Sequence, residues 1–223
     1  MSEIQKRVLQ GETFSTLIVP DAENCSGEYG IVLEAGAKAD IVVLLLPGVS
    51  ASQKFRISME GAGADCNLSG IYLCPENENA VIDVELIHRV GGCSSHQLFK
   101  GIVSGSAKVD FYGKIIVDHN AQKTEAYQEN HSLLLSDGAK VNTRPQLEIY
   151  ADDVKCNHGA TIGKLNEDEQ FYMRSRGISI EEAKVLQMIS FLSPVFEHVG
   201  DIKEREVLKT KVEDSIRHNI MHR

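Results

Sequence analysis

A short alanine-centred motif recurs through the first two-thirds of the chain, and it constrains the fold more than any other feature. Each copy follows a small or turn-forming residue and precedes an apolar segment rich in β-branched residues. The copies are AKAD at Ala37, AGAD at Ala62, AKVD at Ala107, AQKT at Ala121 and AKVN at Ala139. Their spacing is too irregular for a strict repeat, but it fits coils of unequal length whose corners recur at equivalent points. The pattern favours a β-solenoid.

A sandwich or barrel of antiparallel strands would also contain many short strands, and periodicity alone does not exclude it. Two features favour the solenoid. Small residues gather at the same point of each unit, as a tight corner requires, and the dipeptides typical of antiparallel hairpins are scarce, Asp137-Gly138 being the clear case. A solenoid leaves unpaired backbone at its ends, so it needs a cap or a partner there.

Helix signals appear only in the last quarter of the chain. Three capping patterns predict helix starts at Asn166 with Glu169, at Ser179 with Glu182 and at Asp201 with Glu204. Gly177 is expected to end the first helix, and Pro194 to bend or stop the second. We therefore expect a β-helix core over residues 1–165 and a C-terminal helical region over residues 166–223.

The apolar positions of the last two helices predict how they pack. One face of the second helix carries Ile180, Ala183, Leu186 and Ile189, and the third helix has an i, i+4 stripe of Leu208, Val212, Ile216 and Ile220. Such stripes usually dock on the body of the same domain. Because the third helix is otherwise charged, docking onto a partner is the alternative.

Composition narrows the function classes. The 223 residues carry a formal charge of −9, which argues against a nucleic-acid groove or an anionic membrane surface as partner. The apolar run Ile41–Pro47 is too short to cross a bilayer, and the first residues do not resemble a secretory signal, so we expect a cytoplasmic protein. Five cysteines without a CxxC spacing predict free thiols rather than disulfides or a closed zinc site.

A soft-ligand pair lies just before the predicted helices, in the run DDVKCNHGAT. Residues two apart in a strand share a face, so Cys156 and His158 can present a thiol and an imidazole side by side to iron, zinc or sulfur. Lys155 and a nearby imidazolium would then favour the reactive thiolate. The alternative is that Val154, which has the same strand parity, points into the core. Cys156 would then be packing and His158 an interior imidazole.

Other chemical motifs are weaker. His88 and His96 flank Cys93 and form a possible second metal cluster. The segment GATIGKL after His158 looks like a phosphate loop, but it has the wrong glycine spacing and lacks the Ser or Thr after Lys164, so we expect no nucleotide on this chain. No hydrolase or metalloprotease motif is present, which predicts a protein that is not an enzyme.

The run LEIYADDVKCNHGATIGKLNEDEQFYMRSRGIS, with the upstream AQKTEAYQENHSLLLSDGAKVNTRPQLEI, resembles the C-terminal core of the SufB/SufD family of iron–sulfur cluster assembly proteins. The resemblance covers at least residues 81–199. The combination of CxHGAT with FYxRSRG is its distinctive part. The pattern is closer to SufD, because SufB-type sequences have HEAT where this chain has HGAT, so a carboxylate is missing at Gly159.

The resemblance implies a right-handed parallel β-helix followed by helices, acting as scaffold or accessory subunit for transient iron–sulfur clusters. It implies a homo- or heterodimer with a SufB/SufD-type partner, formed through the β-helix near the CxHGAT region. It also implies docking of a SufC-like ABC ATPase. Cys156 and His158 fall on the cluster or sulfur site, and the ATPase-docking helix carries Phe171, Tyr172, Arg174 and Arg176.

Three departures from the family pattern accompany the resemblance. The chain is about half as long as usual members, Cys93 stands where the family usually has Thr, and the main SufB cluster or persulfide cysteine has no clear counterpart. Two hypotheses follow: a short SufD-like scaffold or accessory subunit, or a structural β-solenoid that keeps the family's shape and handles no iron or sulfur.

Overall fold

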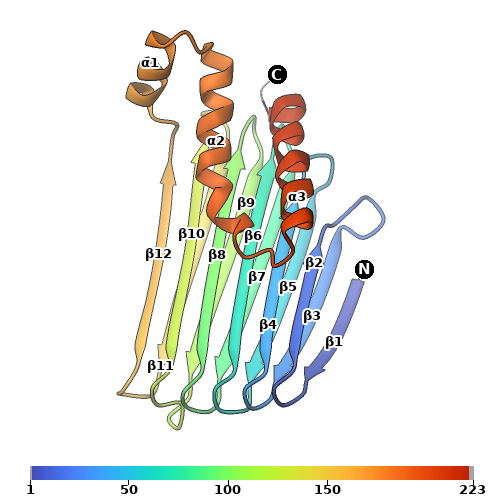
Figure 1. Cartoon of the computed structure of the whole chain (residues 1–223), viewed down its shortest axis with the longest axis vertical. Helices are drawn as coiled ribbons and strands as arrows, with labels where there is room; N and C mark the ends of the chain where they lie inside the picture. The colour runs from blue at the N-terminus through green and yellow to red at the C-terminus, as the bar shows by residue number, and fades with distance from the viewer. Residues whose placement is uncertain (1, 221–223) are drawn as a thin grey trace.

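The computed structural model describes residues 2–220 and consists of two six-stranded sheets with three helices on one side (Figure 1). Strands alternate between the sheets along the chain, so each coil contributes one strand to each. Sheet A contains β1 (Ser2–Val8), β3 (Ser26–Leu33), β5 (Ala51–Met59), β7 (Asn79–His88), β9 (Lys108–Val117) and β11 (Lys140–Ile149). Sheet B contains β2 (Thr13–Ile18), β4 (Lys38–Leu45), β6 (Asp65–Cys74), β8 (Ser94–Val103), β10 (Glu125–Leu134) and β12 (Lys155–Gly163).

Every strand pairing in both sheets is parallel and joins a strand to the strand two places further along the chain. Equivalent residues of successive coils therefore lie over one another in columns. One column of sheet B runs through Ala39, Cys66, Ser95, Ala126 and Cys156. The predicted parallel β-solenoid is confirmed, and the antiparallel sandwich or barrel is excluded.

The recurring alanines occupy the corners between the two sheets. Ala37, Ala107, Ala121 and Ala139 are buried, and the backbone N–H of each donates to the carbonyl oxygen three residues earlier. Gly36 precedes the first of these alanines with a φ of +64°, a conformation that residues with a Cβ rarely adopt. The alanines themselves must be small because they are buried at the corners, where a larger side chain would have no free space.

The space between the sheets is filled by side chains at alternate positions along each strand, as the pleat requires. Phe55, Phe99 and Phe111 are fully buried in this core. Tyr72 is also fully buried, and its hydroxyl is hydrogen-bonded to Asn130 Oδ1 at 2.9 Å and Ser132 Oγ at 2.7 Å. The interior is thus apolar in its middle coils and becomes more polar towards β10.

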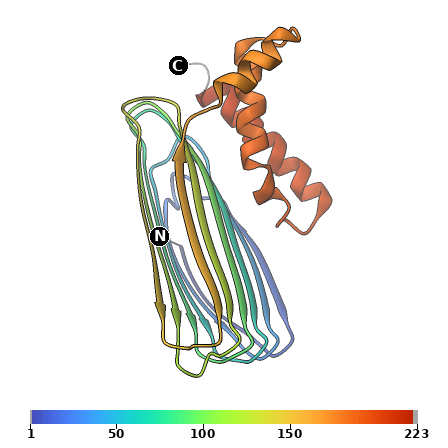
Figure 2. The ribbon, with the colours of Figure 1, turned by 90° about the vertical axis from the view of Figure 1, so that its left-hand side faces the viewer.

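The helices are α1 (Glu167–Ser175), α2 (Ile180–Phe196) and α3 (Ile202–Ser215), the last continued by the π-helical turn η1 (Ile216–Ile220). Of these, α2, α3 and η1 form a second apolar layer on the outer face of sheet B, over its upper half (Figure 2). Strand residues such as Leu44, Ile71 and Ile102 pack against the helices there. The stripe Leu208, Val212, Ile216 and Ile220 is buried in this layer, so the third helix docks on its own chain.

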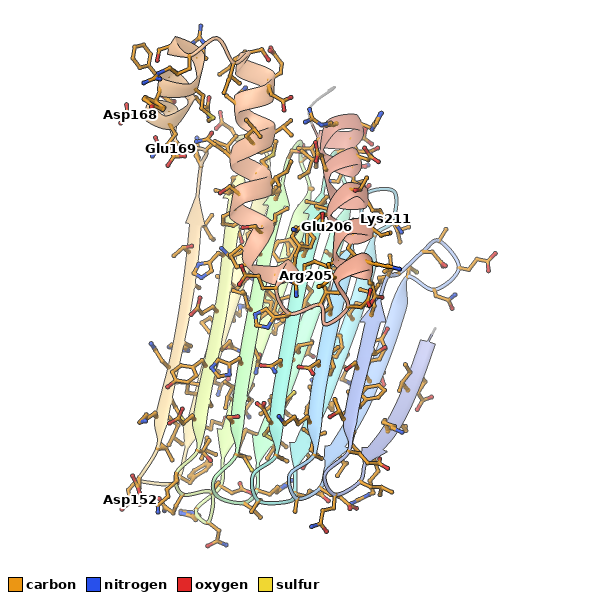
Figure 3. All side chains as sticks on the ribbon, viewed as in Figure 1. Asp152, Asp168, Glu169, Arg205, Glu206 and Lys211 are labelled. Carbon is orange, nitrogen blue, oxygen red and sulfur yellow. The ribbon has the colours of Figure 1, made fainter. Side chains whose placement is uncertain are left out.

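The helix starts agree with the capping patterns. The side chains of Asn166, Ser179 and Asp201 each accept a hydrogen bond from a backbone N–H of the first turn. Arg205, labelled in Figure 3, donates from Nη2 to the carbonyl oxygens of Val199 and Glu197 at 2.9 and 3.3 Å, which ties the start of α3 to the end of α2. No helix within residues 2–220 has both the length and the apolar character to cross a membrane.

Two helix details differ from the expectation. The buried face of α2 is formed by Val185, Met188, Leu192 and Val195 with Ala183, whereas Leu186 is 40% exposed. Pro194 lies in the last turn and does not stop the helix before Phe196. Proline has no N–H to donate to the carbonyl of the residue four positions earlier, and the helix continues for only two residues beyond Pro194.

Replacing Leu192 by alanine should lower the free energy of unfolding by about 2–5 kcal/mol, because the side chain is fully buried between α2 and sheet B. Urea unfolding followed by circular dichroism measures the change. Leu186→Ala, on the exposed side of the same helix, is the matched control and should change stability by less than about 1 kcal/mol. Equal losses in the two variants would mean that α2 does not pack as described.

Candidate functional site

Strand β12 closes sheet B at the end of the solenoid. Within residues 2–220 it pairs with β10 on one side, and β11 likewise ends sheet A. Within the described residues no further coil covers this end of the space between the sheets, and Figure 2 views the molecule from this end. Asp152, labelled in Figure 3, marks the corner before β12, at the opposite end of the strand from α1.

Cys156 and His158 both point towards the interior side of β12. Their register partners on β10 are Ala126 and Gln128, which are buried between the sheets. The expectation that the thiol and the imidazole share a face therefore agrees with the register. Because this is the last coil, Cys156 is half-buried and His158 is exposed.

The alternative raised from the sequence placed Val154, Cys156 and His158 in the core. The structure agrees with it for Val154 and Cys156 but not for His158. Val154 and Cys156 both pack against a small cluster that includes Ile115, Val117 and Ala126. His158, by contrast, has no hydrogen-bond partner among the described residues and is not an interior imidazole. Cys156 and His158 thus lie on the interior side of β12, but they remain accessible from the open end of the solenoid.

The environment of Cys156 does not favour the thiolate. Partial burial raises the pKa of the Cys156 thiol, and a backbone hydrogen bond from Ala126 offsets only part of that effect. Lys155 points to the other face, where its Nζ lies 2.8 Å from Glu125 Oε1. The expected thiolate stabilisation by Lys155 is therefore wrong, because the cation is already paired with the neighbouring coil.

Gly159 and Thr161 of the HGAT segment face the outside of sheet B, whereas Ala160 shares the parity of His158 and pairs with the buried Asn130. Gly159 has the opposite strand parity to His158, and open space surrounds the position where its Cβ would lie. Thr161 Oγ1 lies 2.8 Å from His131 Nδ1, and His131 Nε2 lies 3.0 Å from Glu129 Oε2. A side chain at position 159 would thus project away from the Cys156 and His158 pair. The segment GATIGKL is mostly strand, not a loop at a helix start.

The second predicted cluster is divided between the interior and the outer surface, with His88 on β7 of sheet A and His96 on β8 of sheet B. His88 is fully buried, its Nε2 lies 2.9 Å from Ser95 Oγ, and burial lowers its pKa to about 4, so the ring is neutral. Cys93 is buried nearby in the corner before β8, with its Sγ 3.3 Å from the Gly61 carbonyl oxygen. His96 lies on the outer face, stacked on Tyr127 with ring centroids 4.9 Å apart.

Metal-ligand groups are sparse across the part of the chain that the structure describes. No three side chains of His, Cys, Asp or Glu come together closely enough within it to hold a metal ion. Cys156 and His158 thus offer two ligand atoms per chain. Iron in a cluster prefers thiolate and accepts imidazole, so this donor set is chemically suitable but incomplete.

The four residues predicted to dock an ATPase lie on or just after α1, the helix that projects beyond the sheets in Figure 1. Phe171 and Tyr172 are 73% and 59% exposed. The Arg176 guanidinium lies over the Tyr172 ring, 5.2 Å from its centroid. Arg174 is exposed on the same helix. Aromatic and arginine side chains exposed together are typical of protein interfaces.

Sequence reasoning missed the polar residues that line the interior next to the site. Gln97, Gln128, Asn130 and Ser132 are buried at inward positions of β8 and β10. In the sequence segment AYQENHS these polar residues occupy every second position, and Gln97 begins the segment QLFK. This pattern identifies interior residues only when it is known which face of each strand points into the solenoid.

Replacing Lys155 by alanine should leave the pH profile of Cys156 alkylation unchanged, because the lysine faces away and pairs with Glu125. In both proteins the rate should rise through a pH range above that of an unperturbed thiol, since burial raises the pKa. Iodoacetamide labelling followed by peptide mass spectrometry measures the rate at this cysteine alone. A shift of the profile to higher pH in Lys155→Ala would show that the lysine does stabilise the thiolate.

Comparison with known proteins places this geometry in a family. A family model described as "SUF system FeS cluster assembly, SufBD core domain" matches residues 23–191. The iron–sulfur cluster assembly protein SufD of Escherichia coli is 36% identical over 171 residues, which cover 77% of this chain and 40% of that protein. The chloroplastic protein ABCI7 of Arabidopsis thaliana is 33% identical over 180 residues, or 80% of this chain and 38% of that protein.

A SufBD family protein of Synechocystis is 44% identical over 106 residues, which are 48% of this chain and 23% of that protein. The chain thus spans less than half the length of these three relatives. The match with the family core nevertheless includes β3 to β12, α1 and most of α2. The chain therefore belongs to the SufB/SufD family and contains its SufBD core domain.

Proposed function

We propose that this chain is a scaffold or accessory subunit of a SUF-type iron–sulfur cluster assembly complex. The observation that carries the proposal is the position of Cys156 and His158 on the last strand, facing an interior that no further coil covers. The names of the SufD and SufBD relatives support the same role, since they describe iron–sulfur cluster assembly proteins.

The cluster is the cargo of this protein, and the two ligand atoms explain how it could be released. A complete set of four protein ligands would hold a cluster firmly, whereas a thiolate and an imidazole provide half of such a set. The remaining ligands would come from a second SufB/SufD-type chain or from another partner. A site shared between subunits loses its cargo when the subunits separate.

The open end of the solenoid is the surface that would receive the second chain. Parallel strands β11 and β12 leave unpaired backbone groups along their outer edges, and such edges readily pair with another strand. A homo- or heterodimer formed there would cover Cys156 and His158 and bring both chains' ligands together. It is one of the two ends at which a solenoid needs a cap or a partner.

The helix α1 is the surface that would dock a SufC-like ABC ATPase. Phe171 and Tyr172 are the most exposed aromatic residues on this helix, and a groove lined by Tyr172, Leu186 and Phe191 runs between α1 and α2. Asp168 and Glu169 line the same groove, so it combines apolar and acidic contacts (Figure 3). The partner surface should therefore present apolar side chains flanked by basic ones.

A structural solenoid that handles no iron or sulfur is the second candidate. The raised pKa of the Cys156 thiol favours it, because a protonated thiol is a poor ligand and a poor nucleophile. Iron binding would have to displace the thiol proton. The reconstitution below decides between the two candidates.

Anaerobic reconstitution with iron and sulfide should give visible charge-transfer absorption with the wild-type chain and its SufB/SufD-type and ATPase partners, and a greatly reduced band with Cys156→Ala. Cys25→Ala is the matched control, because Cys25 is another half-buried thiol but lies between β2 and β3. If wild type and Cys156→Ala give the same spectrum, cluster holding at Cys156 is refuted and the structural solenoid is supported.

Replacing Phe171 and Arg174 together by alanine should abolish co-purification with the ATPase. The melting temperature should change little, because both side chains are exposed. Tyr150→Ala removes an aromatic side chain that is 53% exposed and lies between β11 and β12, and it should leave ATPase binding intact. Retained binding by the double variant would refute the docking assignment.

A further inference from the structure

The side-chain amide of Gln128 has one half of its hydrogen bonding satisfied and the other half open. Gln128 is 1% exposed, and its Nε2 donates to Gln97 Oε1 at 2.9 Å. Its Oε1 is buried and has no partner. A buried acceptor without a donor is costly and uncommon, so this oxygen calls for an explanation.

The next residue in the same column is His158. The register of β8, β10 and β12 places Gln97, Gln128 and His158 over one another, all on the interior side. Along this column the amide N–H of Gln128 donates to the residue one coil earlier. A ring N–H of His158 donating to Gln128 Oε1 would repeat that pattern one coil later.

Sheet A holds the Gln128 amide in place from the other side. A methyl group on Gly113 would overlap the Gln128 amide, so the glycine provides the space in which the amide lies. The two ends of a primary amide diverge, and an amide whose nitrogen faces Gln97 turns its oxygen away from Gln97. The His158 ring, exposed and without a hydrogen-bond partner in the described part of the chain, has a donor to offer.

We propose that Gln128 is a positioning residue for His158. Its Oε1 accepts a hydrogen bond from one ring N–H, which fixes the neutral tautomer and orients the ring. The other ring nitrogen then keeps its lone pair free beside Cys156. Histidines that bind metals are commonly oriented in this way by an acceptor on their second nitrogen. The hydrogen bond is a property of this chain alone, whereas its value for holding iron rests on the proposed function.

The test compares Gln128→Met, which keeps the length of the side chain but replaces the amide with a weakly accepting thioether, with Gln53→Met. Gln53 is an equally buried glutamine, hydrogen-bonded to Tyr29 and Cys25. It lies on β5, which two strands of sheet A separate from the terminal strand β11. Long-range ¹H–¹⁵N spectra of histidine-labelled protein at a pH where the rings are neutral give the tautomer of each ring. His158→Gln assigns the signal.

We expect a single His158 tautomer in wild type and in Gln53→Met, and a mixture of both in Gln128→Met. Anaerobic titration with Co²⁺ of each protein together with its SufB/SufD-type partner, followed by thiolate-to-cobalt absorption, should show about 10- to 100-fold weaker binding in Gln128→Met than in wild type. If Gln128→Met does not fold, Gly113→Ala displaces the same amide and should give the same mixture.

Identical tautomer populations in wild type and Gln128→Met would overturn the inference. Equal Co²⁺ affinity in the two proteins would overturn the positioning role even if the tautomer changes. A wild-type protein that shows the single tautomer and its loss in Gln128→Met, but binds no Co²⁺, would support the hydrogen bond and refute only the proposed cluster function. The two proposals thus fail separately.

Discussion

The backbone hydrogen bonds between successive coils are the constraint on which the rest of the structure depends. They hold each residue over its equivalent in the coil before, so that side chains far apart in sequence meet in columns. Lys155 meets Glu125 in one such column, and Gln128 meets Gln97 in another. These columns also determine which side chains form the outer face of sheet B, on which the helices pack.

Position in the stack, rather than residue type, decides what a side chain can do. Cys66 and Cys156 lie in one column of sheet B, on the same interior side. Cys66 is fully buried in a middle coil, where desolvation raises its pKa far above the ordinary thiol value. Cys156 has a column neighbour, Ala126, on one side only, because its coil is the last, so it remains accessible. A solenoid can thus place identical chemistry in a sealed core and at an open end.

Much of the architecture could be predicted from the sequence because it depends on local chemistry. The corner alanines identified the solenoid, and the caps at Asn166, Ser179 and Asp201 identified the helix starts. The shared face of Cys156 and His158 followed from strand parity. All of these depend on residues within a few positions of one another.

The errors concern contacts that cross between coils or depend on the face of a strand. Lys155 was assigned to Cys156 because the two are adjacent in sequence, whereas its partner is Glu125 on the neighbouring coil. His88 and His96 looked like one cluster, but the corner between them sends one ring inside and the other outside. The role proposed for Gln128 was hidden for the same reason, since it needs the register of three strands.

The short link between β12 and α1 gives the molecule a mechanical property. The strand ends at Gly163 and the helix begins at Glu167, while Cys156 lies near the other end of the strand. A pull on α1 along the strand axis would shear every β10–β12 hydrogen bond at once and meet high resistance. A pull across the sheet would peel the bonds singly from the helix end, reaching Cys156 last. The direction of a force on the helix, more than its size, would therefore decide whether the thiol keeps its place.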